Sequence, residues 1–241
     1  MSTVIKYLHF RDIINQMCAI REDEVTLHFK TDGIIVKFVD LANVALVNLT
    51  IPTSVFECYD LTEQDIVIKL ENLRTSANLT YGFVTISQIA DENKTLTMLK
   101  FESGKYSSVF KHDADAVVKK EPNEPTMIWT SKTIIKASDM RKFLTKTSPY
   151  YDKIRVHIQN NHSHFYVSND HDKLTFEIDN GMITVDNNSS LYNMDYMKRL
   201  FKHLKGDVEF SSGNDMPCKI SIQVGGCEIG YYMLAPRIES D

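Results

Sequence analysis

The two halves of this 241-residue chain show the same order of sequence patterns. In the first half, a helical pattern over residues 10–19 leads through acidic residues into residues 25–29, which alternate as a half-buried strand does. In the second half, a helical pattern over residues 138–146 leads into a similar alternation that begins at Ile154. A tandem duplication of one α+β domain is the simplest interpretation. Chance similarity of two strand-rich halves is the alternative.

Most other segments also alternate between apolar and polar residues, which is typical of strands. The sequence Thr-Asp-Gly at residues 31–33 is a hairpin signal, and Gly104 marks the turn of a second hairpin. Further strands are expected at residues 34–39, 44–49, 95–101 and 105–111. Strands outnumber helices, so the predicted fold class is α+β with large antiparallel sheets.

Four segments have helical rather than strand periodicity. Besides the two named above, one is marked by Leu70, Leu73 and Ala77. The last is marked by Met194, Met197, Phe201 and Leu204, and Gly206 is expected to end it. For the helix over residues 138–146, Ser138 and Asp139 are the expected N-terminal caps.

The middle of the chain has a different composition. Residues 119–125 hold two prolines and four charged residues without a strand pattern. Proline stiffens such a segment and removes a backbone donor, which favours a linker. We therefore expect a first domain at 1–115, a linker at 116–127 and a second domain at 128–241.

Bulk charge excludes one simple class of function. The formal net charge is −5, so the chain as a whole is not a basic nucleic-acid-coating protein, although a local basic surface remains compatible with it. The four cysteines form no CxxC pair, which argues against a zinc module. No apolar run is long enough to cross a bilayer, and no membrane partner is expected. These features predict an intracellular protein with inert thiols.

Several ordered blocks carry a specific resemblance. They are residues 32–36, 39–47, 52–59, 190–192, 214–217 and 231–239. In this order they resemble the DNA sliding clamps of the proliferating cell nuclear antigen (PCNA) family, of archaeal and eukaryotic type. The stretch at residues 79–94 departs most from the family pattern, so strand borders are least certain there.

The resemblance implies two similar domains per chain and three chains closed head to tail into a pseudo-six-fold ring around duplex DNA. It implies a processivity factor without catalysis or cofactor. The partners would be double-stranded DNA of any sequence, the chain itself as a homotrimer, a clamp loader, and a DNA polymerase, flap nuclease and ligase bound through short peptides. The location would be the cytoplasm or nucleoid of an archaeal cell, or the nucleus of a eukaryotic one.

A clamp of this kind needs inward-facing cations and no element that reads bases. The candidate DNA-binding residues come from the four helices or stand beside them, and solvated helix faces are the alternative explanation. These residues are Arg11, Arg74, Lys136, Arg141, Lys142, Lys146, Lys198, Arg199, Lys202 and Lys205. The second-half helices carry most of them, so we expect Lys198, Arg199 and Lys202 to matter more than Arg11 or Arg74.

Two further surfaces follow from the resemblance. The first is an intersubunit contact between two edge strands, formed by Tyr106, Ser107, Ser108, Val109 and Phe110 of one subunit with Lys173, Leu174, Thr175, Phe176, Glu177 and Ile178 of the next. The second is an apolar groove for partner peptides, formed by Val39, Val44, Leu46, Val118, Pro217, Tyr232, Ala235, Pro236 and Ile238. Ordinary core packing is the alternative explanation for the groove residues.

Two competing interpretations stay open. An enzyme would need a catalytic motif, and no GxSxG, P-loop or HExxH sequence occurs. His162 and His164 could share a strand face and hold a metal ion, but polar turn residues are the commoner explanation, so no metal is expected. Alternatively, the chain is one member of a heterotrimeric or checkpoint-type clamp.

Overall fold

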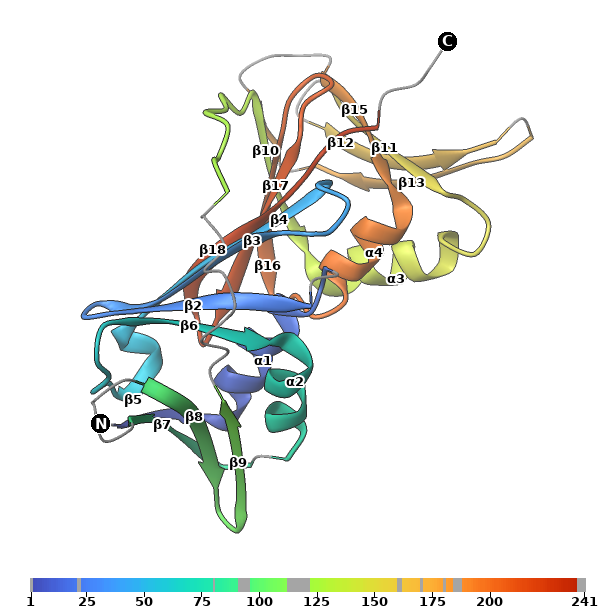
Figure 1. Ribbon diagram of the computed structural model, residues 1–241. Coiled ribbons are helices and arrows are strands. Elements are labelled where there is room, and N and C mark those ends of the chain that lie inside the picture. The colour runs from blue at the N-terminus through green and yellow to red at the C-terminus, as the bar shows by residue number, and fades with distance from the viewer. Residues whose placement is uncertain are drawn as a thin grey trace. The chain divides into compact units, whose positions relative to one another are not determined.

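The computed structural model describes residues 2–20, 23–79, 81–90, 96–111, 122–159, 162–169, 171–179, 181–183 and 188–237. The chain forms two compact units (Figure 1). The first comprises residues 1–41, 47–122 and 224–230, and the second comprises 42–46, 123–223 and 231–241. Strands β4 (Ala45–Pro52) and β18 (Cys227–Leu234) therefore contribute residues to both units.

In the first unit, helices α1 and α2 pack against each other and against antiparallel sheet. One sheet has the order β5-β1-β7-β8-β9, and a second set of strands runs β4-β3-β2-β6. The helix α1 buries Phe10 against Phe101 of β8, with 5.5 Å between the ring centroids. The elements are β1 (Ser2–Lys6), α1 (Tyr7–Met17), β2 (Glu24–Lys30), β3 (Gly33–Val39), a 3-10 turn (Thr53–Val55), β5 (Phe56–Cys58), β6 (Gln64–Lys69), α2 (Leu70–Leu79), β7 (Phe83–Ala90), β8 (Leu96–Ser103) and β9 (Tyr106–Lys111).

The second unit is built in the same way. One sheet has the order β13-β12-β11-β15, and a second set of strands runs β14-β10-β16-β17-β18. Phe165 and Phe210 meet edge to face in its core, with ring centroids 5.1 Å apart. The elements are β10 (Ser131–Lys136), α3 (Ala137–Thr147), β11 (Lys153–Gln159), β12 (His162–Ser168), β13 (Lys173–Ile178), β14 (Gly181–Ile183), β15 (Asn188–Asn193), α4 (Met194–Phe201), β16 (Asp207–Ser212) and β17 (Cys218–Val224).

The order of elements repeats. From β1 to β9 and again from β10 to β18, one strand, one helix, five strands, one helix and three strands follow one another. The pairings repeat as well: β1 lies between β5 and β7, as β10 lies between β14 and β16. Likewise β2 lies between β3 and β6, as β11 lies between β12 and β15. The predicted α+β fold class with two similar domains is confirmed.

Several predicted boundaries were wrong. The first helix begins at Tyr7 and ends at Met17, and the last ends at Phe201, well before Gly206. Lys136 rather than Ser138 is the N-cap of α3, without a side-chain hydrogen bond. The stretch at residues 79–94, where the resemblance is weakest, contains β7. Among the described residues, no helix is both long and apolar enough to cross a membrane.

Candidate nucleic-acid interface

Helix α4 of the second unit separates its charged and apolar residues onto different faces. The side chain of Asn193 caps the helix by accepting hydrogen bonds from the backbone N–H groups of Asp195 and Tyr196. Met194, Met197, Leu200 and Phe201 are buried. Lys198 and Lys202 are exposed, and their i, i+4 spacing places them on one stripe. The helix thus presents a basic surface because its apolar stripe is used by the core.

Helix α3 is tied to α4 by Arg141. Its guanidinium donates hydrogen bonds to the backbone carbonyls of Phe201, over 3.2 Å, and of Leu204. Phe201 is the last residue of α4 and Leu204 follows three residues later, so both carbonyls lie at or just beyond the end where a helix leaves carbonyls unpaired and carries partial negative charge. Arg141 was predicted to bind DNA, but its donors hold the end of α4. Its role in this conformation is therefore structural at least in part.

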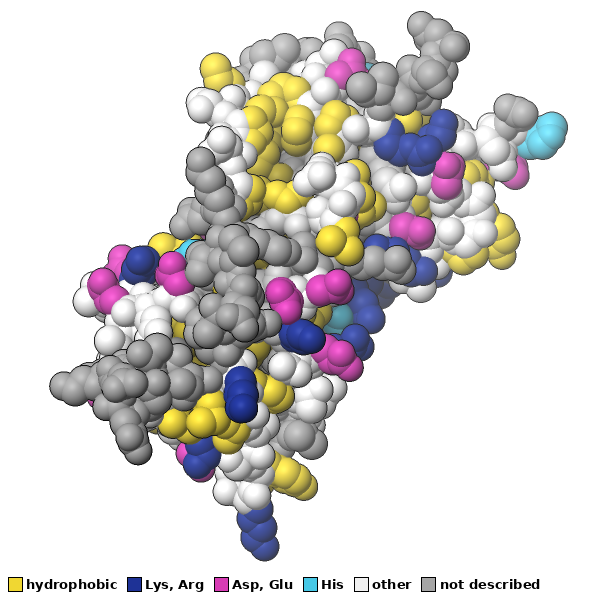
Figure 2. Space-filling view, in the orientation of Figure 1, with side chains coloured by type: hydrophobic (Ala, Val, Ile, Leu, Met, Phe, Trp, Pro, Cys, Tyr) yellow, Lys and Arg dark blue, Asp and Glu magenta, His cyan; other side chains and the backbone are white. Residues whose placement is uncertain are grey.

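Together, α3 and α4 form a shallow groove with a basic rim. The groove is lined by Arg141, Leu144, Thr145, Asp195, Lys198, Arg199 and Lys202. Figure 2 shows Lys and Arg side chains gathered beside these helices. The exposed lysines on or next to the two helices are Lys136, Lys142, Lys146, Lys198, Lys202 and Lys205. Part of this charge is neutralised, since the ammonium of Lys142 lies 3.4 Å from Asp139.

The helices of the first unit carry fewer cations. Arg74 on α2 is exposed, and Glu71 stands one turn before it. Arg11 on α1 is half-buried, with its guanidinium 5.3 Å from the centroid of the Tyr7 ring. The acidic residue Asp12 follows directly. The predicted concentration of basic residues on the second-unit helices therefore agrees with their exposure, although DNA binding by any of them stays a prediction.

The two predicted contact strands each lie at the edge of a sheet. Strand β9 pairs only with β8, and β13 pairs only with β12, among the described residues. Tyr106 on β9 is 51% exposed and Leu174 on β13 is 49% exposed. Such edges offer unpaired backbone groups to another chain.

Aromatic side chains on the two edge strands pack against neighbouring aromatic residues of their own unit. Phe176 of β13 stacks on Phe143 of α3, with 5.7 Å between ring centroids. Tyr81 meets Tyr106 edge to face at 6.0 Å. Apolar side chains at the two edges are thus held by their own unit on one side and left open on the other.

The residues of the predicted peptide groove are divided in their exposure. In the second unit, Val44, Pro217, Ala235 and Pro236 are all half-exposed. The backbone N–H of Ala235 donates to the carbonyl of Val44 over 2.9 Å, so the C-terminal segment lies beside residues 42–46. Figure 2 shows hydrophobic side chains gathered over β17 and the end of β18. In the first unit, Val39 is also half-exposed.

Two members of this group belong to the core instead. Tyr232 has no exposed surface and Leu46 is only 7% exposed, because both lie on the inner side of their strands. Their predicted contact with a peptide is therefore not supported by this conformation. Val118 and Ile238 lie outside the described residues.

Sequence reasoning missed the polar contacts that hold the surrounding loops. The phenol of Tyr192 is buried and donates to the carbonyl of Met216 over 2.9 Å, which fixes the loop before β17. Burial raises the pKa of Tyr192 well above its ordinary range. Arg237 donates to the carboxylate of Asp152 over 2.9 Å, and its backbone N–H to the carbonyl of Leu191. No local sequence pattern signals contacts between residues so far apart in the chain.

Solved structures with the same architecture define the class. A structure of the C-terminal region of FEN-1 bound to A. fulgidus PCNA matches with a TM-score of 0.88 and 22% identity, covering 100% of this chain and 99% of that one. A PCNA2–PCNA3 complex from Sulfolobus tokodaii matches with a TM-score of 0.83 and 19% identity, covering 99% and 100%. The fold is that of the DNA sliding clamps.

The sequence comparison points to the same family. A DNA polymerase sliding clamp from Methanosphaerula palustris is 29% identical over 96% of both chains. No protein-family model matches the chain. The resemblance to PCNA-type clamps that the ordered sequence blocks indicated is thereby confirmed over nearly the whole chain.

Proposed function

We propose that this protein is a DNA sliding clamp, which encircles duplex DNA and holds replication and repair enzymes on it without catalysing a reaction itself. The observation that carries the proposal is the full-length match in fold and sequence to proteins of that name. A protein that acts on chromosomal DNA works inside the cell, in the nucleoid or nucleus according to the host. The domain borders at residues 115 and 128 stay a proposal, since residues 112–121 are outside the described part.

The basic surface of α3 and α4 supports contact with DNA. Exposed lysines on both helices project from the side opposite the buried residues. Lysine ammonium groups attract phosphates over a distance of roughly 10 Å at moderate salt, without reading bases. Such attraction holds a duplex and still lets it slide. The acidic net charge of the whole chain is no obstacle, because the local field decides binding.

The internal repeat supports closure of a ring. Within the chain, β18 and β4 are neighbours in a sheet. In the repeat, β9 takes the place of β18, and β13 takes the place of β4. In the described part of the chain, both counterparts lie at the edge of their sheets. Pairing β9 of one chain with β13 of the next would give both edges a partner, and repeating this pairing around a closed ring would leave neither β9 nor β13 open in any chain.

Charges beside the two edges favour this pairing. Lys105 precedes β9 and Lys111 is its last residue, whereas Asp172 and Asp179 flank β13. Opposite charges across an edge help to select the partner and its register. The half-exposed residues Val44, Ala235 and Pro236 offer a separate surface for short peptides of a polymerase, nuclease or ligase. A clamp loader would also bind the protein, in order to place it on DNA.

The decisive experiment tests encirclement. The purified protein is incubated with a matching clamp loader, ATP and nicked circular plasmid, and the DNA-bound fraction is isolated by gel filtration. We expect the protein to stay on circular DNA and to leave after a restriction enzyme linearises the plasmid. Equal retention on circular and linear DNA would refute the proposal.

A heteromeric ring is the second candidate, because one structural neighbour is a PCNA2–PCNA3 complex. Self-complementary edges favour a homotrimer. Light scattering of the protein purified alone decides between the two. A trimer is expected, and a stable monomer at micromolar concentration would indicate that other subunits complete the ring.

A further inference from the structure

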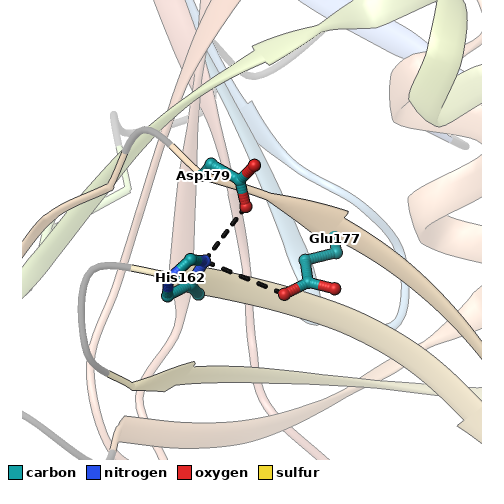
Figure 3. A group of neighbouring side chains, drawn as sticks. All are labelled: His162, Glu177 and Asp179. Atoms are coloured by element: carbon teal, nitrogen blue, oxygen red, sulfur yellow. Dashed lines mark hydrogen bonds and ion pairs between the residues drawn. The ribbon is translucent and has the colours of Figure 1, made fainter.

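One face of the four-stranded sheet of the second unit gathers imidazole and carboxylate groups. His162 begins β12, Glu177 lies near the end of β13, and Asp179 follows that strand (Figure 3). The strand register pairs His164 with Glu177 and, one step further along the same face, brings His162 beside Asp179. All three side chains in the figure are exposed and point toward one another.

The ligand atoms of these residues stand at distances that suit a metal ion. The Nδ1 atom of His162 is 3.0 Å from Oδ1 of Asp179 and 3.8 Å from Oε1 of Glu177. Zinc bonds of roughly 2.0 Å in a tetrahedron separate neighbouring ligand atoms by about 3.3 Å, between these two values. The three atoms all lie within 4.8 Å of one another. Small side-chain rotations would therefore complete the geometry.

A second imidazole lies beside the cluster, close to one of its members. Nδ1 of His164 lies 3.8 Å from the same Oε1 of Glu177. The rings of His162 and His164 are stacked, with centroids 6.2 Å apart, because residues two apart on a strand share a face. Among the described residues, the group whose ligand atoms all lie within 4.8 Å of one another consists of His162, Glu177 and Asp179, so His164 lies beside this group and is not part of it. One imidazole and two carboxylates are ligand types that zinc accepts, and a water molecule would fill the fourth position of a tetrahedral site.

We propose that His162, Glu177 and Asp179 bind one divalent transition metal ion of the zinc class. Two carboxylates place negative charge that a dication offsets, and an imidazole ligand favours zinc-class ions over magnesium or calcium. Exposed ion pairs alone would contribute little to stability. The site is separate from the basic helices and from the proposed peptide surface.

The site stays accessible if β13 also forms the edge of a ring. Strand pairing uses the backbone groups in the plane of the sheet, whereas side chains such as those of Glu177 and Asp179 stand perpendicular to it. The metal would lie on the face of the sheet, beside the seam between two subunits. The inference does not depend on the clamp function, since metal binding is measured directly on the purified chain.

The test uses untagged full-length protein freed of metal with a chelator. Zinc chloride is titrated in by calorimetry, and we expect one ion per chain. His162→Ala and Asp179→Asn should each weaken binding about tenfold or more, since each removes a ligand. His171→Ala is the matched control, because His171 is exposed in the turn at the other end of the β12–β13 hairpin.

Cobalt(II) provides a readout that follows ligand geometry. The intense visible absorption of tetrahedral cobalt should form with the wild type and with His171→Ala, and should be lost in His162→Ala. Absence of zinc uptake by the wild type would overturn the proposal. So would zinc binding by His162→Ala as tight as that of the wild type, or loss of binding in His171→Ala alone. Circular dichroism of each variant checks that the fold is kept.

Discussion

At the scale of single residues, Arg141 shows how a cation of the basic surface can serve the fold. Its guanidinium bonds to the carbonyls of Phe201 and Leu204 and so fastens α3 to the end of α4. Replacing it in Arg141→Met leaves these carbonyls without their charged donor. We expect a loss of about 1–2 kcal/mol in the free energy of unfolding, measured by urea denaturation at fixed protein concentration.

Lys142→Met is the matched control for this prediction. Lys142 is the next residue along α3, is exposed, and has its ammonium 3.4 Å from Asp139. An exposed i, i+3 pair contributes little, so the variant should stay within about 0.5 kcal/mol of the wild type. An equal loss of stability in both variants would show that the hydrogen bonds of Arg141 do not contribute specifically to the free energy of unfolding.

At the scale of elements, the proposed assembly depends on the edge strands β9 and β13. Leu174 points to the same side of β13 as Phe176, yet stays half exposed because β13 is the last strand of its sheet in the described part of the chain. A neighbouring β9 would cover it. Leu174→Glu would bury a charge in that contact and should weaken the trimer at least about tenfold. Sedimentation velocity over a range of protein concentrations measures the effect.

Ile134→Glu is the control for the edge prediction. The exposed fraction of Ile134, 43%, is similar to the 49% of Leu174. Its strand β10, however, already has neighbours on both sides, β14 and β16. The trimer should keep its stability in this variant. A similar dissociation in both variants would show that the added charge acts through general destabilisation and that β13 is not the contact.

The sequence predicted some elements of the fold and not others. Alternation of apolar residues located β9 and the hairpin around Gly104, whose φ of 56° explains the glycine. The repeat of patterns predicted the repeat of the fold. Cap residues and helix ends were less accessible: Asn193 caps α4 through two backbone N–H groups, a contact that periodicity does not reveal. The burial of Tyr232 could not be predicted, because a residue facing the core and one facing a groove have the same sequence pattern on a strand.

At the scale of the whole molecule, an acidic chain carries a local basic surface. The formal net charge is −5, yet exposed lysines gather on α3 and α4, whereas α1 and α2 add Arg11 and Arg74 beside Asp12 and Glu71. Attraction to DNA depends on the cations that face the phosphates and is screened by salt. The two units thus share a fold but differ in the charge on their helices. Helices α3 and α4 should therefore contribute more to DNA retention than α1 and α2.

Charge reversal tests this inequality. Lys198→Glu combined with Lys202→Glu removes two exposed cations from one stripe of α4, so retention on circular DNA should fall about tenfold or more at moderate salt. Arg11→Glu with Arg74→Glu changes the net charge equally and should have a smaller effect, because Arg11 is half-buried against Tyr7.

Lys132→Glu with Lys219→Glu, on strands β10 and β17, makes the same change of net charge away from the helices, at the cost of the Lys132–Glu209 ion pair, and should bind as the wild type does. Retention is measured after loading at several salt concentrations. A weaker dependence on salt in the α4 variant alone would locate the phosphate contacts on that helix. Equal losses from the α4 pair and the Arg11–Arg74 pair would mean that the uneven distribution of charge has no consequence for holding DNA.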